Sequence, residues 1–472
     1  MVQQTSANIE PVFAAGWDSG DIAWVLVSTA LVFMMTFGLA FFYGSLCREK
    51  HIIDTLTKTC LVLGLISIQW VLIGFSFAFG GDGRFWGNFE YSALVNLGTS
   101  DLVFVGFQMS FAALTSALIT GAVVGRMKPI SFLIFIFTWT TIVYCPITHW
   151  VWGNGGFLLN LGEVFGSDNA YGAIDFAGGF VVEINSGMSA IACALALGKR
   201  HKADRDEAPV KLSLNLLGAT MLWIGWMGFN GGSALAADDI AGLALINTQI
   251  CAGAAMFTWG CLDMTFKKEF DLEGALYGGV CGLVIITSNA GFIIPAYALL
   301  QGIYGAILSY IVLWTWMKYA HLSFIDDSLY VFCSHGFGGL VGTFSTGLFA
   351  SSGVNPNIPD GAFYGNWTLL GYQCFGILVS CSWSFFVTYL IMLALRFTIG
   401  IRAEYEPEPN AEELSKLGLR VGGGGILENS LIIPGPPLMT EVEQGYNDGV
   451  DDKTKKIEEA EARTSHSVTV VS

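Results

Sequence analysis

The feature that most constrains this chain is a series of apolar segments, each about 20 residues long, that recurs from residue 22 to residue 396. A helix of that length crosses the hydrocarbon core of a bilayer and satisfies its own backbone groups there. Only 13% of the 472 residues are charged, too few to cover a water-facing surface. The sequence therefore predicts an all-α polytopic membrane protein with eleven transmembrane helices. The predicted spans are 22–46, 55–79, 102–125, 130–149, 175–197, 211–232, 240–264, 274–291, 295–317, 328–349 and 366–396.

The basic residues predict the topology of these spans. Lys and Arg are concentrated in the cytoplasmic connections of membrane proteins. All but one of the 22 Lys and Arg residues lie at odd-numbered connections or after the last span, and the exception is Arg84. An error of one in the number of spans would scatter these charges over both sides. We therefore expect a multi-pass protein of the plasma membrane with its N-terminus outside and its C-terminus in the cytoplasm.

The two ends of the chain differ in composition from the apolar region. Residues 1–21 are predicted to form an extracellular N-terminal segment, and residues 22–396 the membrane domain. Residues 397–472 are rich in acids and contain Gly-rich and Pro-rich runs, which is typical of a flexible cytoplasmic tail. Because much of the net charge of −16 lies in this tail, we expect it to reflect solvation, and we expect no nucleic-acid partner.

Enzymatic chemistry has no support in the sequence. The ten cysteines lie in or beside apolar segments without metal-ligand or redox spacing, so packing within a helical bundle explains them. There is no nucleophile–base pair and no phosphate-binding loop. We therefore expect neither an enzyme nor a bound cofactor or metal.

Two ionisable residues, Glu183 and His335, are predicted near the middle of the membrane. Each lies eight residues after an aspartate, Asp175 or Asp327, at the start of its span. A helical rise of about 1.5 Å per residue places each side chain roughly 12 Å from one face, and the two spans run in opposite directions. In a core about 30 Å thick, both side chains then lie near the midplane. Charged groups at that depth are costly, so they indicate a functional site.

The same two segments indicate an inverted repeat. A glycine follows each ionisable residue after four positions, at Gly187 and Gly339, and would let two helices approach closely. Transporters built from inverted repeats carry their site at the repeat interface. A Glu and a His that face each other there can share a proton or accept one from a cation. The alternative is that the two side chains are unrelated and have separate neighbours.

The other histidines are expected to be solvated or to cap helices. They are His51, His149, His201, His321 and His466.

Aromatic side chains and one hydroxyl collect at the predicted outer ends of the spans, namely Phe107, Trp152, Phe229 and Ser233. Aromatic faces attract small cations, and a hydroxyl can accept a hydrogen bond from one. The alternative is the ordinary belt of aromatic residues at a membrane interface. That alternative explains less well why some of these aromatics lie within Gly-rich runs, where backbones are crowded.

Several stretches of the chain resemble the ammonium transporter family, the Amt/Mep/Rh proteins. They extend over most of residues 20–400, in the order found in the family. They are Phe41-Phe42-Tyr43-Gly44, Phe107-Gln108-Met109-Ser110-Phe111, Asp175-Phe176-Ala177-Gly178-Gly179, Gly225-Trp226-Met227-Gly228-Phe229-Asn230, and Asp326-Asp327 followed by His335-Gly336.

The resemblance implies a homotrimer in the lipid bilayer. Each subunit would have two inverted five-helix repeats, a final helix and its own pore. Phe107, Trp152 and Ser233 match the family's external ammonium-recruitment site. Phe107 and Phe229 match the stacked phenylalanines that close the pore below that site.

The resemblance also assigns the remaining site residues. Asp175 and Trp226 match residues that support the recruitment site, and His335 matches the second of the twin pore histidines. The first histidine position is occupied by Glu183, as in Mep-like members. We expect Glu183 to broaden the pH range of transport and to favour electrogenic transport.

The implied function is ammonium transport, in which ammonium is recruited outside and deprotonated, and ammonia then passes through a hydrophobic pore with a proton. One alternative is an electroneutral, Rh-like ammonia channel. Another is an ammonium sensor that signals through the tail. The tail is also the candidate contact for a cytoplasmic regulator.

Overall fold

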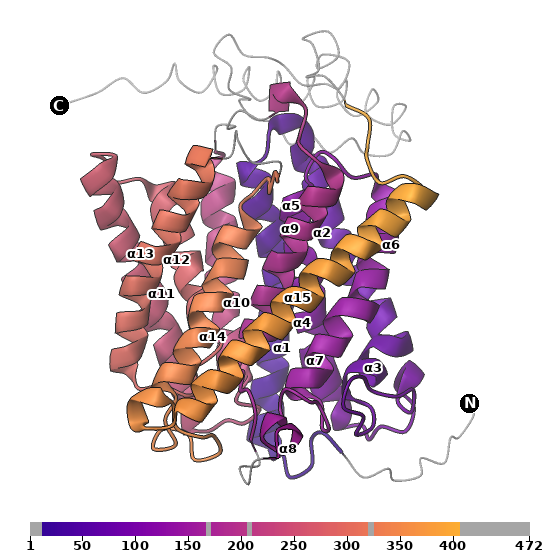
Figure 1. Ribbon diagram of the computed structural model, residues 1–472, viewed down its shortest axis with the longest axis vertical. Coiled ribbons are helices and arrows are strands. Elements are labelled where there is room, and N and C mark those ends of the chain that lie inside the picture. The colour runs from indigo at the N-terminus through magenta and orange to yellow at the C-terminus, as the bar shows by residue number, and fades with distance from the viewer. Residues whose placement is uncertain (1–11, 167–170, 205–209, 320–324, 406–472) are drawn as a thin grey trace, which may run out of the picture. The chain divides into compact units, whose positions relative to one another are not determined.

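A computed structural model describes residues 12–166, 171–204, 210–319 and 325–405. These residues form helices joined by turns and loops (Figure 1). Within these ranges, nine helices are long and apolar enough to cross a membrane. The predicted all-helical, polytopic class is therefore confirmed. Most of the predicted N-terminal segment and tail, residues 1–11 and 406–472, together with His321 and His466, lie outside the described residues.

The helices of the first part of the chain match the first five predicted spans in position. Three of these spans contain a segment of π-helix, which inserts an extra residue into a turn. The elements are α1 (Ser19–Leu46), α2 (Glu49–Gln69), η1 (Trp70–Gly74), α3 (Phe75–Phe79), η2 (Ser92–Leu94), α4 (Asp101–Leu118), α5 (Thr120–Val123), α6 (Pro129–Trp139), η3 (Thr140–Tyr144), α7 (Cys145–Trp152), α8 (Leu161–Val164), η4 (Gly179–Ile184) and α9 (Asn185–Leu197).

The second part of the chain repeats this pattern of apolar helices. It begins after a short 3₁₀ turn, η5 (Lys202–Asp204). The elements are α10 (Leu212–Gly232), α11 (Asp239–Phe266), α12 (Leu272–Ile286), α13 (Pro295–Tyr319), η6 (Phe332–Gly336), α14 (Phe337–Phe349), η7 (Ala362–Tyr364) and α15 (Trp367–Thr398).

The two parts of the chain pack side by side. Figure 1 shows the helices up to α9 in indigo to magenta on one side, α10–α14 on the other, and α15 running obliquely across both. The main seam lies between α1 and α10. A Cβ added at Gly218 would lie 2.3 Å from the backbone nitrogen of Phe42. Such small residues allow the backbones to approach closely, which is a common way to pack helices in lipid.

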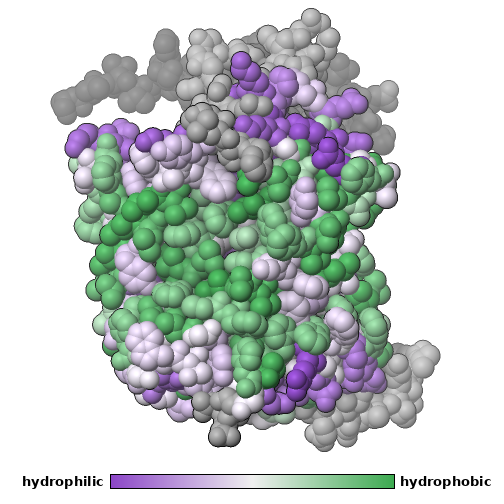
Figure 2. All heavy atoms as spheres, viewed as in Figure 1, coloured by the Kyte–Doolittle hydropathy of each residue, from purple (hydrophilic) through white to green (hydrophobic). Residues whose placement is uncertain are grey.

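Hydrophobic side chains form a broad belt over the face shown in Figure 2, and hydrophilic ones collect at its two ends. One of these ends, here named the basic end, carries Lys50, Arg126, Arg200, Lys267 and Arg402. Contacts between separate connections hold this end together. Lys50 pairs with Asp204 at 2.9 Å, and Arg126 donates to the carbonyl oxygen of Gly198 at 2.6 Å. The connections that the positive-inside rule placed on one side therefore meet in space.

Two of the helices begin later than predicted. The fifth starts at Gly179 instead of 175, and the tenth starts at Phe332 instead of 328. In each case an aspartate accepts the first amide hydrogens, because helix starts leave these donors unpaired. Asp175 accepts from the amide nitrogens of residues 178–180, and Asp327 accepts from Phe332. The assumption of continuous helix from each aspartate, on which the predicted depth rested, is therefore wrong.

The eighth helix and the tail also differ from the prediction. The eighth helix ends at Ile286 instead of residue 291, because Thr287 and Ser288 use their carbonyl oxygens to accept amides from residues 176–177. The predicted flexible tail begins too early. The last helix extends to Thr398, and residues 401–403 pair with residues 126–128 at the basic end.

Candidate functional site

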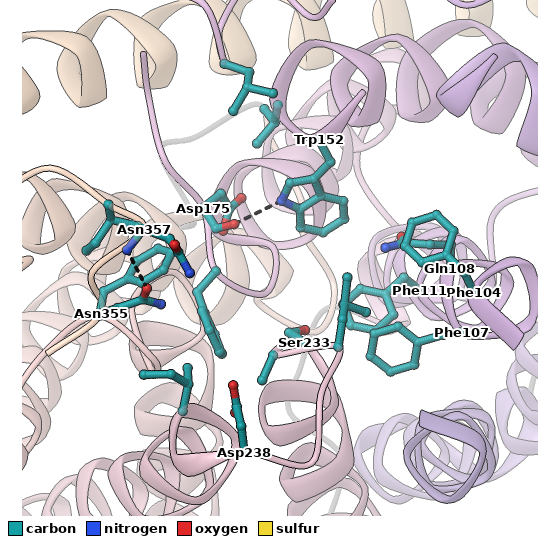
Figure 3. A pocket seen from close by; sticks show the side chains of 18 of the residues that line it. Phe104, Phe107, Gln108, Phe111, Trp152, Asp175, Ser233, Asp238, Asn355 and Asn357 are labelled. Carbon is teal, nitrogen blue, oxygen red and sulfur yellow. Dashed lines mark hydrogen bonds between the residues drawn. The ribbon is translucent and has the colours of Figure 1, made fainter. Parts of the chain in front are cut away.

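A cavity of about 390 Å³ opens at the end of the molecule opposite the basic end. Figure 3 shows it from close by. It is here named the vestibule. The chain brings Phe107, Trp152, Asp175 and Ser233 together around it, from four separate elements. The lining residues are Phe79, Phe104, Phe107, Gln108, Phe111, Val151, Trp152, Leu159, Asp175, Phe176, Ser233, Ala234, Leu235, Asp238, Ile240, Phe292, Asn355, Asn357 and Ile358.

Asp175 positions Trp152 through its backbone, while its carboxylate binds the amide hydrogens at the start of η4. The indole nitrogen of Trp152 donates to the backbone carbonyl oxygen of Asp175 at 2.9 Å, as Figure 3 shows. The carboxylate of Asp175 is buried and accepts amide hydrogens from Gly178, Gly179 and Phe180 at 2.7–2.8 Å. Asp175 therefore fixes both the start of η4 and the plane of the indole ring.

The stacked phenylalanine pair is Phe111 with Phe229. Their ring centroids are 4.0 Å apart and their planes are inclined by 14°. The assignment of Phe107 to this pair is therefore wrong, because Phe111 lies one helical turn further along α4 and reaches the level of Phe229. Phe107 lines the vestibule above it, 4.8 Å from the Phe111 ring. Trp152 meets Phe111 edge-on at 6.0 Å.

Ser233 and Trp226 come from the end of α10. The Ser233 hydroxyl donates to the carbonyl oxygen of Phe229 at 2.8 Å, so its oxygen can still accept a hydrogen bond in the vestibule. Trp226 is buried, and its indole nitrogen donates to the Thr287 hydroxyl at 2.8 Å. Its ring lies 5.6 Å from that of Phe229. Trp226 therefore supports the stacked pair from behind and does not line the vestibule.

Glu183 and His335 meet inside the protein. The Nδ1 atom of His335 lies 2.6 Å from Oε2 of Glu183, and both side chains are buried. The alternative that the two side chains have unrelated neighbours is therefore wrong. The second carboxylate oxygen, Oε1, is buried and has no hydrogen-bond partner within the described part of the chain. It remains available to accept a proton or a hydrogen bond.

Glycines bring the two helices that carry this pair into backbone contact. A Cβ added at Gly187 would lie 2.2 Å from the Cα of Gly336. A Cβ added at Gly339 would lie 2.7 Å from the Cβ of Glu183. The predicted role of Gly187 and Gly339 in close approach is confirmed, and each contacts the neighbourhood of the opposite member of the pair.

The pair lies between two cavities. A second cavity, of about 570 Å³, is lined at the basic end by Arg48, Arg200, Lys267 and the residues 328–330 that precede η6. His335 follows this cavity along η6, whereas Glu183 follows the vestibule along η4. α11 reaches from one cavity to the other, and its 28 residues extend about 42 Å.

The described histidines outside this pair, His51, His149 and His201, have structural partners. His149 is buried, not solvated, and its ring nitrogens lie 2.9 and 2.5 Å from the carbonyl oxygens of Ala78 and Gly83. His51 lies 3.2 Å from Asp204, and the ring of His201 stacks on Tyr405. Within the described ranges, no group of three or more His, Cys, Asp or Glu residues could hold a metal ion.

Comparison with known proteins decides the class of this site. A model of the Ammonium Transporter Family matches residues 23–419, which is most of the sequence. The chain belongs to this family. The assignment confirms that the protein is an ammonium transporter and not an enzyme.

Relatives of the transporter cover nearly the whole membrane region. It is 40% identical over 403 residues to a putative ammonium transporter of Methanothermobacter thermautotrophicus, covering 83% of this chain and 95% of the relative. It is 36% identical over 408 residues to an ammonium transporter of Bacillus subtilis, with coverages of 84% and 97%. The crystal structure of Saccharomyces cerevisiae Mep2 matches with a TM-score of 0.75 and 31% identity, covering 84% of this chain and 95% of that one.

Proposed function

We propose that the transporter recruits ammonium in the vestibule, removes its proton near the Phe111–Phe229 pair, and conducts ammonia past Glu183 and His335. The proton follows through that pair, so that transport carries net charge. The observation that carries this proposal is the buried contact of 2.6 Å between Glu183 and His335, located between two cavities at opposite ends of the molecule.

Each vestibule residue has a distinct proposed role. The Trp152 indole and the Phe107 ring attract the cation through their faces, and the Ser233 hydroxyl accepts one of its hydrogens. Asp175 and Trp226 hold these groups in place and do not bind the ion. Phe111 and Phe229 form the gate below, because their contact leaves no room for a hydrated cation.

Deprotonation provides the selectivity. Moving a bare cation into an apolar passage costs several kcal/mol or more. Ammonium avoids this cost by leaving its proton, whereas potassium has none to lose. Oε1 of Glu183 has no hydrogen-bond partner among the described residues, which supports a proton-accepting role for the pair. Because the contact couples the two groups, their titrations belong to the pair.

The proposed architecture is a membrane domain over residues 22–396 with eleven crossings, of which α12 and the η6–α14 segment are the shorter ones. The first ten form two inverted repeats, a view supported by the matching aspartate-capped starts of η4 and η6. We place the basic end in the cytoplasm and the N-terminus outside, in the plasma membrane, because basic residues favour the inner side. The assembly we propose is a homotrimer.

Voltage-clamped uptake of ammonium at several external pH values tests this proposal. Inward current that saturates with ammonium and accompanies uptake is the expected result. Uptake without current would favour the electroneutral channel. A chain that binds ammonium with negligible flux would favour the sensor, as would loss of ammonium-dependent growth only when residues 406–472 are deleted.

A further inference from the structure

Aromatic and carboxylate or amide side chains face each other across part of the vestibule. Figure 3 shows Trp152, Phe107 and Phe111 on one side, and Asp238 and Asn355 on the other. Among the described residues that line the cavity, two are carboxylates and none is Lys, Arg or His. The cavity therefore has a net negative lining. Low-dielectric walls around a cavity of one charge focus its field and raise the local concentration of the opposite charge.

The two carboxylates, Asp175 and Asp238, differ in how much of their charge reaches the cavity. The Asp175 carboxylate is buried beneath three amide hydrogens and directs its charge into the start of η4. Asp238 is exposed, and its Oδ1 accepts a single hydrogen bond, from the amide nitrogen of Ala241 at 2.9 Å. Figure 3 shows the end of its side chain pointing into the cavity near Ser233.

The start of α11 fixes the direction of the Asp238 side chain. Asp238 is the N-cap of this helix and has an extended backbone conformation, with φ −120° and ψ −174°. The N-cap hydrogen bond ties one carboxylate oxygen to the helix and turns the other toward the vestibule. An exposed side chain that would otherwise sample many rotamers is thereby held at the entrance.

We propose that Asp238 is an affinity-determining residue for ammonium, which it attracts and holds at the vestibule entrance before the ion reaches Trp152 and Ser233. This inference rests on the proposed function, because it assigns a residue to the first step of that pathway. Its action is electrostatic and lies outside the pore. It therefore changes the concentration of ammonium at which transport is half-maximal, and leaves the maximal rate unchanged.

Asp238→Asn distinguishes the role of the negative charge from the role of the N-cap hydrogen bond. An asparagine also accepts the N-cap hydrogen bond, so α11 keeps its start while the vestibule loses one negative charge. Asp239→Asn is the matched control, since it removes the same charge one residue further along, at a side chain that does not line the cavity. Asp238→Glu keeps the charge, so its KM for ammonium should stay close to that of the unmodified chain.

The measurement is ammonium-dependent uptake by the full chain in proteoliposomes, at low and high ionic strength set with N-methylglucamine chloride. At low ionic strength, Asp238→Asn should raise KM roughly threefold to tenfold. The difference should shrink at about 1 M salt, where charges are screened beyond about 3 Å. Maximal uptake, and the KM of Asp239→Asn, should match the unmodified chain.

Two results would overturn this inference. One is an unchanged KM in Asp238→Asn at low ionic strength. The other is an equal rise in Asp239→Asn, which would assign the effect to general surface charge. Absence of ammonium uptake by the unmodified chain would instead contradict the proposed function.

Discussion

The Nδ1 atom of His335 and the Oε2 atom of Glu183 lie 2.6 Å apart, although 152 residues separate them in the chain. Each comes from a helix that begins at an aspartate-capped π-segment, and the two helices meet through glycine. A carboxylate and an imidazole at this distance can hold one proton between them. The pair therefore gives a proton a place to reside in the buried interior of the protein.

Replacing Glu183 should change how transport depends on pH. Glu183→Gln keeps the size and one acceptor oxygen but cannot take a proton, so we expect ammonium-dependent current to fall roughly tenfold or more. Glu183→His should retain transport over a narrower pH range and with stronger exclusion of potassium. Voltage-clamped currents at several pH values, with ammonium and potassium compared, measure both. Unchanged pH dependence and selectivity in both variants would refute the assigned role.

Removing a ring from the stacked pair should open the pore to other cations. We expect Phe111→Ala to raise potassium leak into proteoliposomes by roughly tenfold or more, because the stack blocks entry of a partly hydrated ion. Phe107→Ala removes an aromatic side chain one turn away and leaves the stack intact. It should mainly weaken ammonium affinity. A potassium leak through Phe107→Ala as large as that through Phe111→Ala would instead support Phe107 as a gate residue.

A methyl group at Gly187 should push apart the two helices that carry Glu183 and His335. Its Cβ would overlap the Cα of Gly336, so Gly187→Ala should destabilise the protein by about 2 kcal/mol or more and abolish transport. Gly253→Ala is the control, since that glycine, also helical, has nothing within 4 Å of an added Cβ. Its stability should be unchanged or higher, because alanine favours helix. Thermal unfolding in detergent distinguishes the two, and equal midpoints would contradict the packing argument.

Asp326 should stabilise the basic end at neutral pH. Burial favours a higher pKa for this carboxyl, but hydrogen bonds and charge from Arg200, with the charge of Arg126, hold the pKa below its usual value. A lowered pKa adds stability above the unfolded value of about 3.9 and loses it as the pH falls through the folded value. Asp326→Asn should therefore lower the unfolding temperature at pH 7, with a difference that shrinks below about pH 4.

An exposed ion pair provides the comparison for Asp326. Arg84 and Glu163 lie 3.1 Å apart with side chains 56% and 70% exposed, whereas those of Arg200 and Asp326 are 23% and 13% exposed. Exposed pairs contribute about 0–1 kcal/mol. Glu163→Gln should thus leave the unfolding temperature nearly unchanged at every pH. If Asp326→Asn and Glu163→Gln changed the unfolding temperature equally, the partly buried pair would contribute no more stability than the exposed one.

Much of the fold could be predicted because lipid imposes simple rules on sequence. Apolar length located the helices, and the positions of Lys and Arg located the basic end. The spacing around Glu183 and His335 identified the central pair, because few ionisable residues are tolerated at that depth. The parts that depend on tertiary contacts were less predictable. The late starts of η4 and η6 result from the positions of the backbone amides that donate to the carboxylates of Asp175 and Asp327.

The stacked phenylalanine pair also depends on tertiary contacts that the sequence does not reveal. Phe107 and Phe111 are four residues apart and lie on one face of α4, so the sequence alone does not say which ring reaches Phe229. That choice depends on how the side chains of α4 pack against the end of α10. A Cβ added at Gly232 would lie 2.9 Å from a ring carbon of Phe107, so this glycine makes room for Phe107 beside the end of α10. The pairing of Phe229 with Phe111 follows from that packing.

The contact between Gly187 and Gly336 has a consequence for how the proposed pore can work. Because no side chains lie between these two backbones, the helices cannot slide past each other without a clash. A rocking motion of one helix against the other would expose unpaired peptide groups. An alternating-access cycle, in which one half of a carrier swings against the other, would have to break this seam at every turnover. We therefore expect a pathway in which side chains move while these two backbones stay in contact.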